Sequence, residues 1–259
     1  MAPSVLLRRL LFACIPNVKL STSVPFGGTI RYRARTHKGL LLRRVTDFPN
    51  ERGIFACYAE FVAPDAVVFD VGANIGFHAV PLALRATRGR VVAFEPDSDN
   101  LRLLGENIAA NGVSARVQVV AKAVSDRVGA VRFWRDMVSS ATGTIAPKAG
   151  NSGSHRRVGR RPVEVMVEAT TIDAFVAENP GLVPTLVKID VEGAETNVVE
   201  GMRQTALSHR PDIIIDGTPR ACVELLLEWG YRLVEVQTRS PVLDAQGQIP
   251  STIYATSRA

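Results

Sequence analysis

The amino-acid sequence predicts an α/β protein with a doubly wound, mostly parallel sheet. Short apolar runs, rich in valine and isoleucine, alternate along the chain with segments of helical periodicity. Strands that are apolar on both faces are typical of a parallel sheet covered by helices on each side. A glycine-rich turn follows the first of these runs, where open α/β sheets bind their ligands. We expect one large domain with an extension, because 259 residues fit a single hydrophobic core.

The predicted elements divide the chain into an N-terminal extension, residues 1–62, and a catalytic domain, residues 63–259. In the extension we expect an amphipathic helix within residues 1–15, a hairpin over Thr29–Val45 and a short helix over Glu51–Val62. The hairpin prediction depends on alternating residues with a glycine in the middle of the segment.

The strands of the catalytic domain are predicted from apolar runs. These runs occupy Ala66–Val71, Arg90–Phe94, Val117–Val120, Pro184–Ile189, Asp212–Ile215, Arg232–Val236 and Ile249–Thr256. Helical patterns follow the first strand as far as Ala86 and recur at Pro96–Asn111, Ala194–Leu207 and Arg220–Trp229. Asp97 or Ser98 is expected to cap the second of these helices, and Gly112 to end it. We expect the last strand to enter the sheet antiparallel, as the second arm of a closing C-terminal hairpin.

The composition excludes several classes of protein. Hydrophobic residues make up 46% of the chain, more than a disordered chain carries. The three cysteines are far apart, which speaks against a disulfide framework or zinc site and favours a reducing, cytoplasmic compartment. No apolar run approaches the roughly 20 residues of a membrane span. The helix in residues 1–15 either docks on the domain or makes a weak contact with a membrane surface. The net charge of +6 favours acidic partners without choosing among them.

A long basic loop, residues 138–162, lacks any period and is rich in serine, glycine, arginine and lysine. Its arginines are Arg156, Arg157, Arg160 and Arg161. One interpretation is a solvated connection. The other is a lid that closes over the ligand crevice and grips an anionic acceptor through paired hydrogen bonds. Few aromatic residues accompany these charges, which disfavours a nucleic acid as partner.

The turn after the first strand is the clearest nucleotide-binding signal. Asp70 ends the strand, and Gly72, Asn74 and Gly76 follow it with a spacing that lets the backbone approach a ligand. Glu95 ends the second strand, where a carboxylate can accept both hydroxyls of a ribose. A dinucleotide-binding turn has its third glycine three residues after the second. This chain has phenylalanine in that position, which counts against NAD and favours a cofactor without a pyrophosphate.

Acidic residues follow the fourth predicted strand. Lys188 and Asp190 lie on one face of the strand, and Glu192 and Glu195 are predicted to share a face of the next helix. In the functional interpretation, Asp190 contacts the cofactor or acceptor, and one of the two glutamates is the general base. In the structural alternative, Lys188 pairs with Asp190, and the glutamates favour the helix N-terminus through its dipole.

Two further candidates for the chemistry remain open. Asp190 and Asp216 end neighbouring strands and offer oxygens for Mg²⁺, although we predict no metal. His78 opens the first helix of the domain, where it is either a base or a packed residue. The sequence after the fourth strand has no NPPY-like motif, which disfavours a nucleobase amine as acceptor.

Four segments together resemble the FkbM family of methyltransferases. They are DVGANIGF (Asp70–Phe77), AFEPDSDNLRLLGENIAANG (Ala93–Gly112), AVSD (Ala123–Asp126), and KIDVEGAE (Lys188–Glu195) followed by Gly201. The resemblance covers Val67–Asp216. The occurrence of KIDVEGAE downstream of DVGANIGF is highly specific for this family.

This resemblance implies a class I methyltransferase fold, Rossmann-like, and S-adenosyl-L-methionine as cofactor. By the same resemblance, the cofactor-binding residues are Asp70, Gly72, Asn74 and Gly76 at the methionine part, Glu95 at the ribose, and Ala123 and Val124 with the two residues after them at the adenine. Family members usually carry glutamate at the end of the fifth strand, whereas this chain has Asp216, which puts the role of that position in doubt. The expected reaction is O-methylation of a small-molecule or glycan acceptor, a saccharide or a secondary metabolite. An RNA or protein methyltransferase and a non-catalytic α/β binding module are the alternatives.

Overall fold

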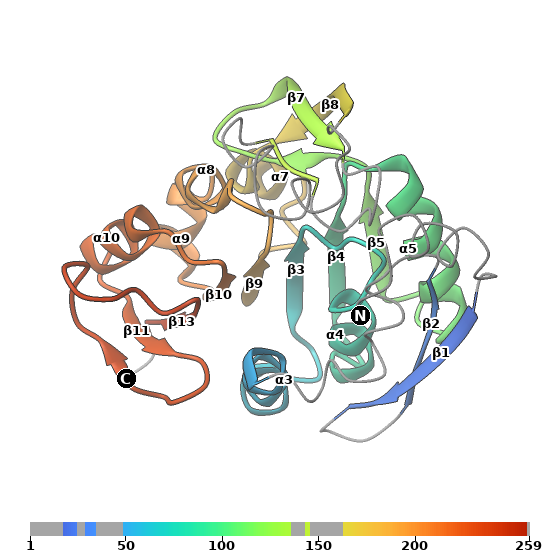
Figure 1. The fold of residues 1–259 in the computed structure, drawn as a ribbon, viewed down its shortest axis with the longest axis horizontal. Coiled ribbons are helices and arrows are strands. Elements are labelled where there is room, and N and C mark those ends of the chain that lie inside the picture. Colours follow the sequence, from blue (N-terminus) through green and yellow to red (C-terminus); the bar gives the residue numbers. More distant parts are fainter. Residues whose placement is uncertain (1–17, 25–28, 35–48, 136–142, 146–162, 258–259) are drawn as a thin grey trace, which may run out of the picture.

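The structure, a computed structural model, describes residues 18–24, 29–34, 49–135, 143–145 and 163–257. Its main sheet has the strand order β12-β11-β13-β10-β9-β3-β4-β5 (Figure 1). The bounds of these strands are β3 Val67–Val71, β4 Arg90–Phe94, β5 Val117–Val120, β9 Leu186–Ile189, β10 Asp212–Asp216, β11 Arg232–Glu235, β12 Pro241–Val242 and β13 Thr252–Thr256. From β5 to β10 all neighbouring strands are parallel.

The predicted doubly wound topology is confirmed. The chain runs outward from β3 through β4 to β5, then returns to β9 on the other side of β3. The carboxyl ends of β3 and β9 therefore flank the point where the strand order reverses, which is where such sheets bind ligands. The predicted antiparallel C-terminal strand is also present, because β13 inserts between β10 and β11 and is antiparallel to both.

Helices cover both faces of the sheet (Figure 1). One core cluster combines residues of α3 (Pro49–Phe61), α4 (Ala79–Arg85) and α5 (Ser98–Ala110) with one face of the strands. The other combines residues of α7 (Ile172–Glu178), α8 (Glu195–Glu200), α9 (Arg203–His209) and α10 (Arg220–Glu228) with the opposite face.

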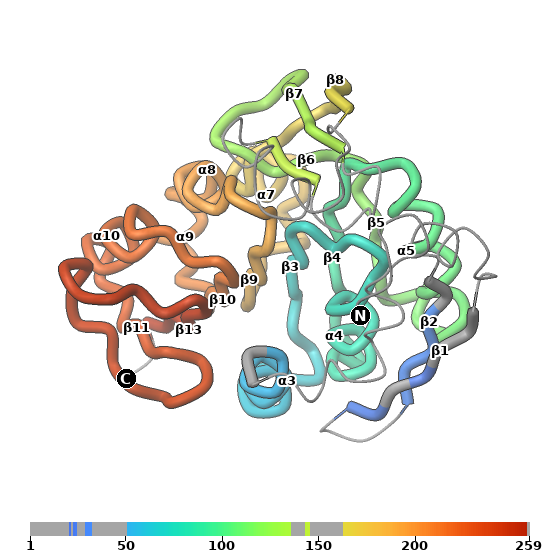
Figure 2. Tube along the Cα trace, viewed as in Figure 1, coloured from blue at the N-terminus to red at the C-terminus, as the bar shows by residue number. Residues whose placement is uncertain are grey.

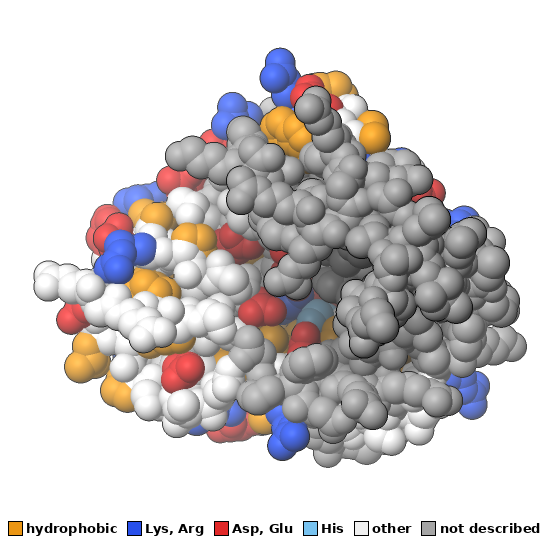
Figure 3. All heavy atoms as spheres, viewed as in Figure 1, with side chains coloured by type: hydrophobic (Ala, Val, Ile, Leu, Met, Phe, Trp, Pro, Cys, Tyr) orange, Lys and Arg blue, Asp and Glu red, His pale blue; other side chains and the backbone are white. Residues whose placement is uncertain are grey.

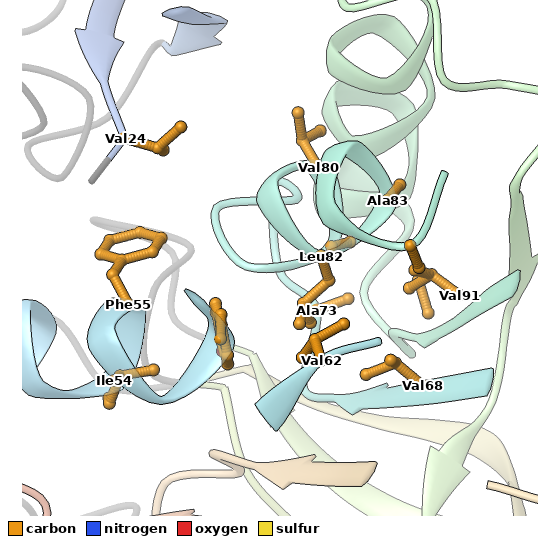
Figure 4. Packing of buried hydrophobic residues seen from close by; sticks show 14 of the residues in the cluster. Val24, Ile54, Phe55, Val62, Val68, Ala73, Val80, Leu82, Ala83 and Val91 are labelled. Carbon is orange, nitrogen blue, oxygen red and sulfur yellow. The ribbon is translucent and has the colours of Figure 1, made fainter. Parts of the chain in front are cut away.

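Neighbouring residues of each strand alternate between the two clusters. Val68 lies in the first cluster and Phe69 in the second. Figure 4 shows Phe55 of α3, Leu82 of α4 and Val68 of β3 gathered in the first cluster. This two-sided burial explains why the strands read as continuous apolar runs in the sequence.

The N-terminal extension packs on the α3, α4 and α5 side. Strands β1 (Val18–Ser23) and β2 (Thr29–Ala34) form an antiparallel hairpin, and β2 contacts α5 (Figure 2). Thr29–Ala34, the first arm of the hairpin predicted over Thr29–Val45, is a strand and pairs with the segment before it. The residues between β1 and β2 contain one proline and two glycines, a stronger turn signal than the single glycine that we relied on. The expected second arm and the helix in residues 1–15 lie outside the described residues.

The short helix predicted at Glu51–Val62 is confirmed as α3. The predicted helix Ala194–Leu207 is wrong in its continuity, since α8 and α9 are separate. Gly201 lies between them, and a Cβ atom there would lie 2.1 Å from the Ser125 carbonyl oxygen, so this position requires glycine. The cap of α5 follows the prediction, because the Asp97 side chain accepts hydrogen bonds from the N–H groups of Asp99 and Asn100.

A second sheet of three strands adds to the predicted architecture. It consists of β6 (Ala123–Val124), β8 (Val163–Thr170) and β7 (Gly129–Arg135), in that order. β7 and β8 pair antiparallel, and β6 joins β8 in parallel. Because β6 follows β5 closely, this sheet lies at the carboxyl ends of the main strands, above them in Figure 1.

Candidate active site

The turn after β3 has the backbone conformation that its sequence demands. Gly72, Asn74 and Gly76 have φ angles of 83°, 51° and 89°, so Asn74 takes the left-handed conformation that we expected of it. A Cβ atom at Gly72 would lie 2.0 Å from the carbonyl oxygen of Asp190. Glycine is therefore required at this position both by the sign of φ and by the close approach of the end of β9.

Glu95, directly after β4, is 4% exposed and is bound from three sides. Its Oε2 accepts a hydrogen bond from the Asn74 N–H at 2.8 Å. Its Oε1 accepts hydrogen bonds from the Asp97 N–H at 2.8 Å and from Asn100 Nδ2 at 3.3 Å. Burial raises the pKa of the Glu95 carboxyl to about 7, although these three donors act against that rise. The contacts fix the carboxylate plane and tie the turn after β3 to the turn after β4.

Lys188 lies fully buried between two carboxylates. Register pairs Lys188 of β9 with Asp70 of β3, and the Lys188 Nζ lies 3.9 Å from Asp70 Oδ1 and 3.2 Å from Asp190 Oδ2. Burial disfavours the charged ammonium, but Asp190 and Asp70 outweigh it and leave the pKa of Lys188 raised. Burial likewise raises the pKa of Asp70 to about 6, against the pull of Lys188. The expected pairing of Lys188 with Asp190 is thus present, with Asp70 as a further partner.

The two glutamates after β9 differ from the prediction. Glu192 has a φ of 59° and lies before α8, so the two residues do not share a helix face. The left-handed backbone of Glu192 and Gly193 reverses the chain there and delays the helix. The Oε1 of Glu195 accepts hydrogen bonds from the N–H groups of Gly193 at 2.9 Å and Val191 at 3.4 Å. Glu195 is 1% exposed, and it holds this loop in place.

A cleft at the strand ends brings most of the predicted cofactor residues together. Of the residues expected to bind cofactor or acceptor, it is lined by Gly72, Asn74, Glu95, Ala123, Val124, Asp190 and Glu192. Asp70, Gly76 and Glu195 are not part of its lining. The sequence analysis missed other lining residues, namely Phe94, Pro96, Asn100, Lys122, Phe133, Gly143, Thr144, Ile145 and Val191.

Part of the long basic loop contributes to this cleft. Residues 143–145 are described, and Thr144 pairs with Trp134 of β7 through backbone hydrogen bonds of 2.8 and 3.2 Å. Thr144 is 2% exposed, and a Cβ atom at Gly143 would lie 2.3 Å from the ring of Phe133. This segment therefore forms a wall of the cleft next to Phe133. The four arginines of the loop lie outside the described residues.

His78 lies at the other end of the turn, where α3 meets α4. Its Nδ1 is 3.0 Å from the hydroxyl of Tyr58, and its Nε2 is 3.7 Å from Oε2 of Glu51. The ring also packs against Phe55 and Phe77, with centroid distances of 5.9 and 4.9 Å. Two residues of α3 thus bracket the histidine that follows the turn.

Asp216, at the end of β10, accepts a hydrogen bond of 2.7 Å from Thr252. Burial and the nearby Asp190 raise the pKa of the Asp216 carboxyl. Within the described part of the chain, no group of three or more His, Cys, Asp or Glu side chains is placed to hold a metal ion. None of the helices in that part is long and apolar enough to cross a membrane.

Comparison with known proteins gives a consistent picture. A family model described as "Methyltransferase FkbM domain" matches residues 70–233. The chain is 32% identical over 164 residues to the hexuronic acid methyltransferase AglP of Haloferax volcanii, covering 61% of this chain and 59% of that protein. It is 28% identical over 153 residues to the 2-O-methyltransferase NoeI of Sinorhizobium fredii, covering 57% of this chain and 61% of that protein. The chain thus spans about three fifths of the length of these curated relatives.

Among solved structures, a methyltransferase FkbM from Methylobacillus flagellatus aligns with a TM-score of 0.48 and 18% identity. The alignment covers 81% of this chain and 53% of that one.

Proposed function

Because the chain belongs to the FkbM methyltransferase family, we propose that it transfers a methyl group from S-adenosyl-L-methionine to a hydroxyl group of a saccharide or secondary metabolite. The observation that carries this proposal is the cleft at the switch point of the sheet, where Gly72, Asn74 and Glu95 meet. Neither the charge nor the composition of the chain distinguishes this function from others, whereas this arrangement fits the chemistry of one cofactor.

The residues of the cleft fit the parts of S-adenosyl-L-methionine. Glu95 presents a carboxylate whose remaining lone pairs suit the two ribose hydroxyls. Gly72 lets the backbone approach closely, and we assign it to the methionine part with Asp70, Asn74 and Gly76. The rings of Phe94 and Phe133 and the side chain of Val124 supply the apolar lining that an adenine requires. We therefore assign Ala123 and Val124 to the adenine end.

When bound, this cofactor supplies a methyl group on positively charged sulfur that an oxygen nucleophile can displace. The protein has mainly to hold the reactants in line and to receive the hydroxyl proton. We assign Asp190 and Glu192, which line the cleft, to the region of the positive charge, where carboxylates favour cofactor binding. We assign Glu195 a positioning role, because its carboxylate holds the loop that carries Glu192.

The expected acceptor is a hydroxyl compound, and the names of two relatives support this class. One of those proteins is a hexuronic acid methyltransferase and the other a 2-O-methyltransferase. A uronic acid carries a carboxylate, which suits a chain of net charge +6. We propose an acceptor with an anionic group near the hydroxyl, which makes hexuronic acids the first compounds to test.

The test has two stages. Calorimetry first measures binding of S-adenosyl-L-methionine to the full chain, where micromolar affinity is expected. Transfer of a labelled methyl group is then measured to methyl glycosides of hexoses and hexuronic acids, with a structured RNA as a further acceptor. Labelled sugar supports the proposal. Labelled RNA, with binding that weakens steeply as salt rises, would assign the enzyme to nucleic acid instead. Absence of cofactor binding would refute the methyltransferase function.

A further inference from the structure

We propose that Arg135 of β7 is a positioning residue for the cofactor, because it holds the second sheet over the adenosine end of the cleft. The inference rests on the proposed function and adds to it the contact that shapes this wall of the site. Arg135 does not line the cleft itself. It joins two parts of the chain that do, the first turn of α5 and the antiparallel strands β7 and β8, which we call the β7–β8 ribbon.

The guanidinium of Arg135 contacts the first residues of α5 at three points. Its Nε lies 2.8 Å from Asp97 Oδ2, its Nη2 donates a hydrogen bond of 2.9 Å to Ser98 Oγ, and its Nη1 lies 4.0 Å from Asp99 Oδ2. The Arg135 side chain is 23% exposed and that of Asp97 only 3%. Water and salt therefore screen this ion pair less than a pair on the open surface.

The helix α5 does not itself require an arginine at this place. The N–H groups at a helix N-terminus carry partial positive charge, which disfavours a cation there. Asp97 already caps α5 by accepting hydrogen bonds from the N–H groups of Asp99 and Asn100. The position of Arg135 is therefore explained by the two structures that it joins.

On the α5 side, the contact leads directly to the carboxylate that we assign to the ribose. The Asp97 N–H donates a hydrogen bond of 2.8 Å to Oε1 of Glu95. A shift of Asp97 would therefore change the orientation of the Glu95 carboxylate. By holding the Asp97 side chain, Arg135 restricts such a shift.

On the β7 side, Arg135 fixes a residue that lines the cleft. Phe133 lies two residues before Arg135, so both side chains lie on one face of β7. The Phe133 ring is buried and is part of the cleft lining. Arg135 lies opposite Val163, at the end of the ribbon away from β6, which pairs with β8 at Ala169. The ribbon is thus held at both ends, which keeps Phe133 at the cleft.

A second arginine of β7 provides a comparison within the same strand. Arg132 pairs with Glu164 of β8 at 3.4 Å, and their side chains are 69% and 50% exposed. Figure 3 shows basic, acidic and hydrophobic side chains exposed together at the top of the molecule, where the second sheet lies in Figure 1. The Arg132 pair lies within the ribbon. Its removal should leave the contact with α5 intact, which makes Arg132 the matched control.

The expected effect on affinity follows from the fraction of protein with the ribbon in place. Loss of the Arg135 contacts lets the end of the ribbon leave α5. If the ribbon is then in place about a tenth of the time, the apparent cofactor Kd rises about tenfold, because affinity scales with the binding-competent fraction.

Calorimetry tests which part of the cofactor depends on Arg135. The ligands are S-adenosyl-L-methionine and 5′-methylthioadenosine, which lacks the amino-acid part. Arg135→Gln should raise the Kd of both about tenfold, whereas Arg132→Gln should leave both within twofold. Arg135→Lys, which keeps the charge, should recover part of the affinity. Loss of affinity for S-adenosyl-L-methionine alone would place the effect at the methionine part and overturn the inference.

A double-mutant cycle tests whether Arg135 acts through Asp97. Asp97→Asn removes the charge but keeps a residue that caps a helix well. Each single variant should raise the Kd by a similar factor, and the double variant should bind no more weakly than either one. Losses that multiply in the double variant would show that the two residues act independently, against the inference.

Fluorescence of Trp134 measures the position of the ribbon without any ligand. The chain has two tryptophans, so a Trp229→Phe background leaves Trp134 as the only one that emits. Acrylamide should quench Trp134 more strongly in Arg135→Gln than in Arg132→Gln, with thermal melts confirming that both are folded. Equal quenching in the two variants would refute the role of Arg135. A wild-type chain that binds neither ligand would instead refute the proposed function, and the quenching comparison would still test the contact.

Discussion

Cofactor binding should weaken as the pH falls below neutrality, and Glu95 should be the cause. The carboxyl is buried and its pKa is raised to about 7, so the free protein holds a proton there in mildly acidic solution. Ribose hydroxyls donate most strongly to a charged carboxylate. Cofactor binding therefore favours the deprotonated form and releases the proton.

The size of the effect follows from the pKa. If the bound carboxyl is fully ionised, a free-protein pKa of about 7 implies a roughly tenfold loss of affinity between pH 8 and pH 6. The stability of the fold should respond in the opposite direction. The folded protein binds this proton more tightly than the unfolded chain, so Glu95 lowers stability as the pH rises from about 4.5 to about 7. Weaker binding at low pH is thus not explained by a weaker fold.

Glu95→Gln is the control variant. The cofactor's own amino group titrates in the same range, but it contributes equally in both proteins. The difference between their pH slopes therefore isolates Glu95. The variant should also bind more weakly at pH 8, by a few kcal/mol, because two charge-assisted hydrogen bonds are lost. One of the N–H groups that face Glu95 also loses its acceptor oxygen, so a thermal melt must accompany the measurement.

Calorimetry at pH 6, 7 and 8, in buffers with different ionisation enthalpies, measures the affinity and the proton release together. We expect close to one proton released per cofactor near pH 6 in the wild type and fewer in the variant. Identical pH slopes in the two proteins would refute the assignment of Glu95 to the ribose.

Three further perturbations test other parts of the site. Gly72→Ala should abolish cofactor binding and lower Tm, because its Cβ atom would lie 2.0 Å from the carbonyl oxygen of Asp190; binding within twofold of wild type would contradict the turn geometry. Lys188→Met should lower the free energy of unfolding by about 3–5 kcal/mol in urea denaturation, and adding Asp70→Asn should restore part of it, because the first change leaves buried carboxylates unpaired. Gly143→Val should raise the cofactor Kd with little change in Tm, because the side chain would press on Phe133; an unchanged Kd would remove this segment from the cofactor site.

The main sheet was predictable because each strand carries its own signal. Residues such as Val68 and Phe69 are buried on opposite faces, so the whole strand must be apolar. The alternation of strands with helices then indicated a parallel, doubly wound sheet. The partner of Thr29–Ala34 was not predictable in the same way, since a strand pattern does not say which neighbour it pairs with. Nor was the break between α8 and α9, where the backbone of Gly201 packs against the carbonyl of Ser125, a residue far away in the sequence.

The residues of the candidate site also fall into two groups, those with a local signal in the sequence and those without one. Gly72, Asn74 and Glu95 were found because each stands at a fixed distance from a strand end. Phe133 and Thr144 were missed because they reach the cleft through the second sheet, folded over the strand ends by contacts far apart in sequence. The left-handed conformation of Glu192 was also not predicted, because in a sequence only glycine and asparagine indicate that conformation.

The N-terminal extension contacts the end of the cofactor turn, which implies that the extension is part of the candidate active site. The family model begins at residue 70, yet the end of the cofactor turn is held by residues before that point. Tyr32 binds the Phe77 carbonyl oxygen, and Phe55 and Tyr58 enclose the ring of His78. All three of these aromatic side chains are buried in the same core cluster as the residues of α4. A core shared in this way does not open along a sequence boundary at residue 62 without exposing those rings to water. Changes in the extension should therefore reach the cofactor turn directly, because β2 and α3 contact the end of the turn.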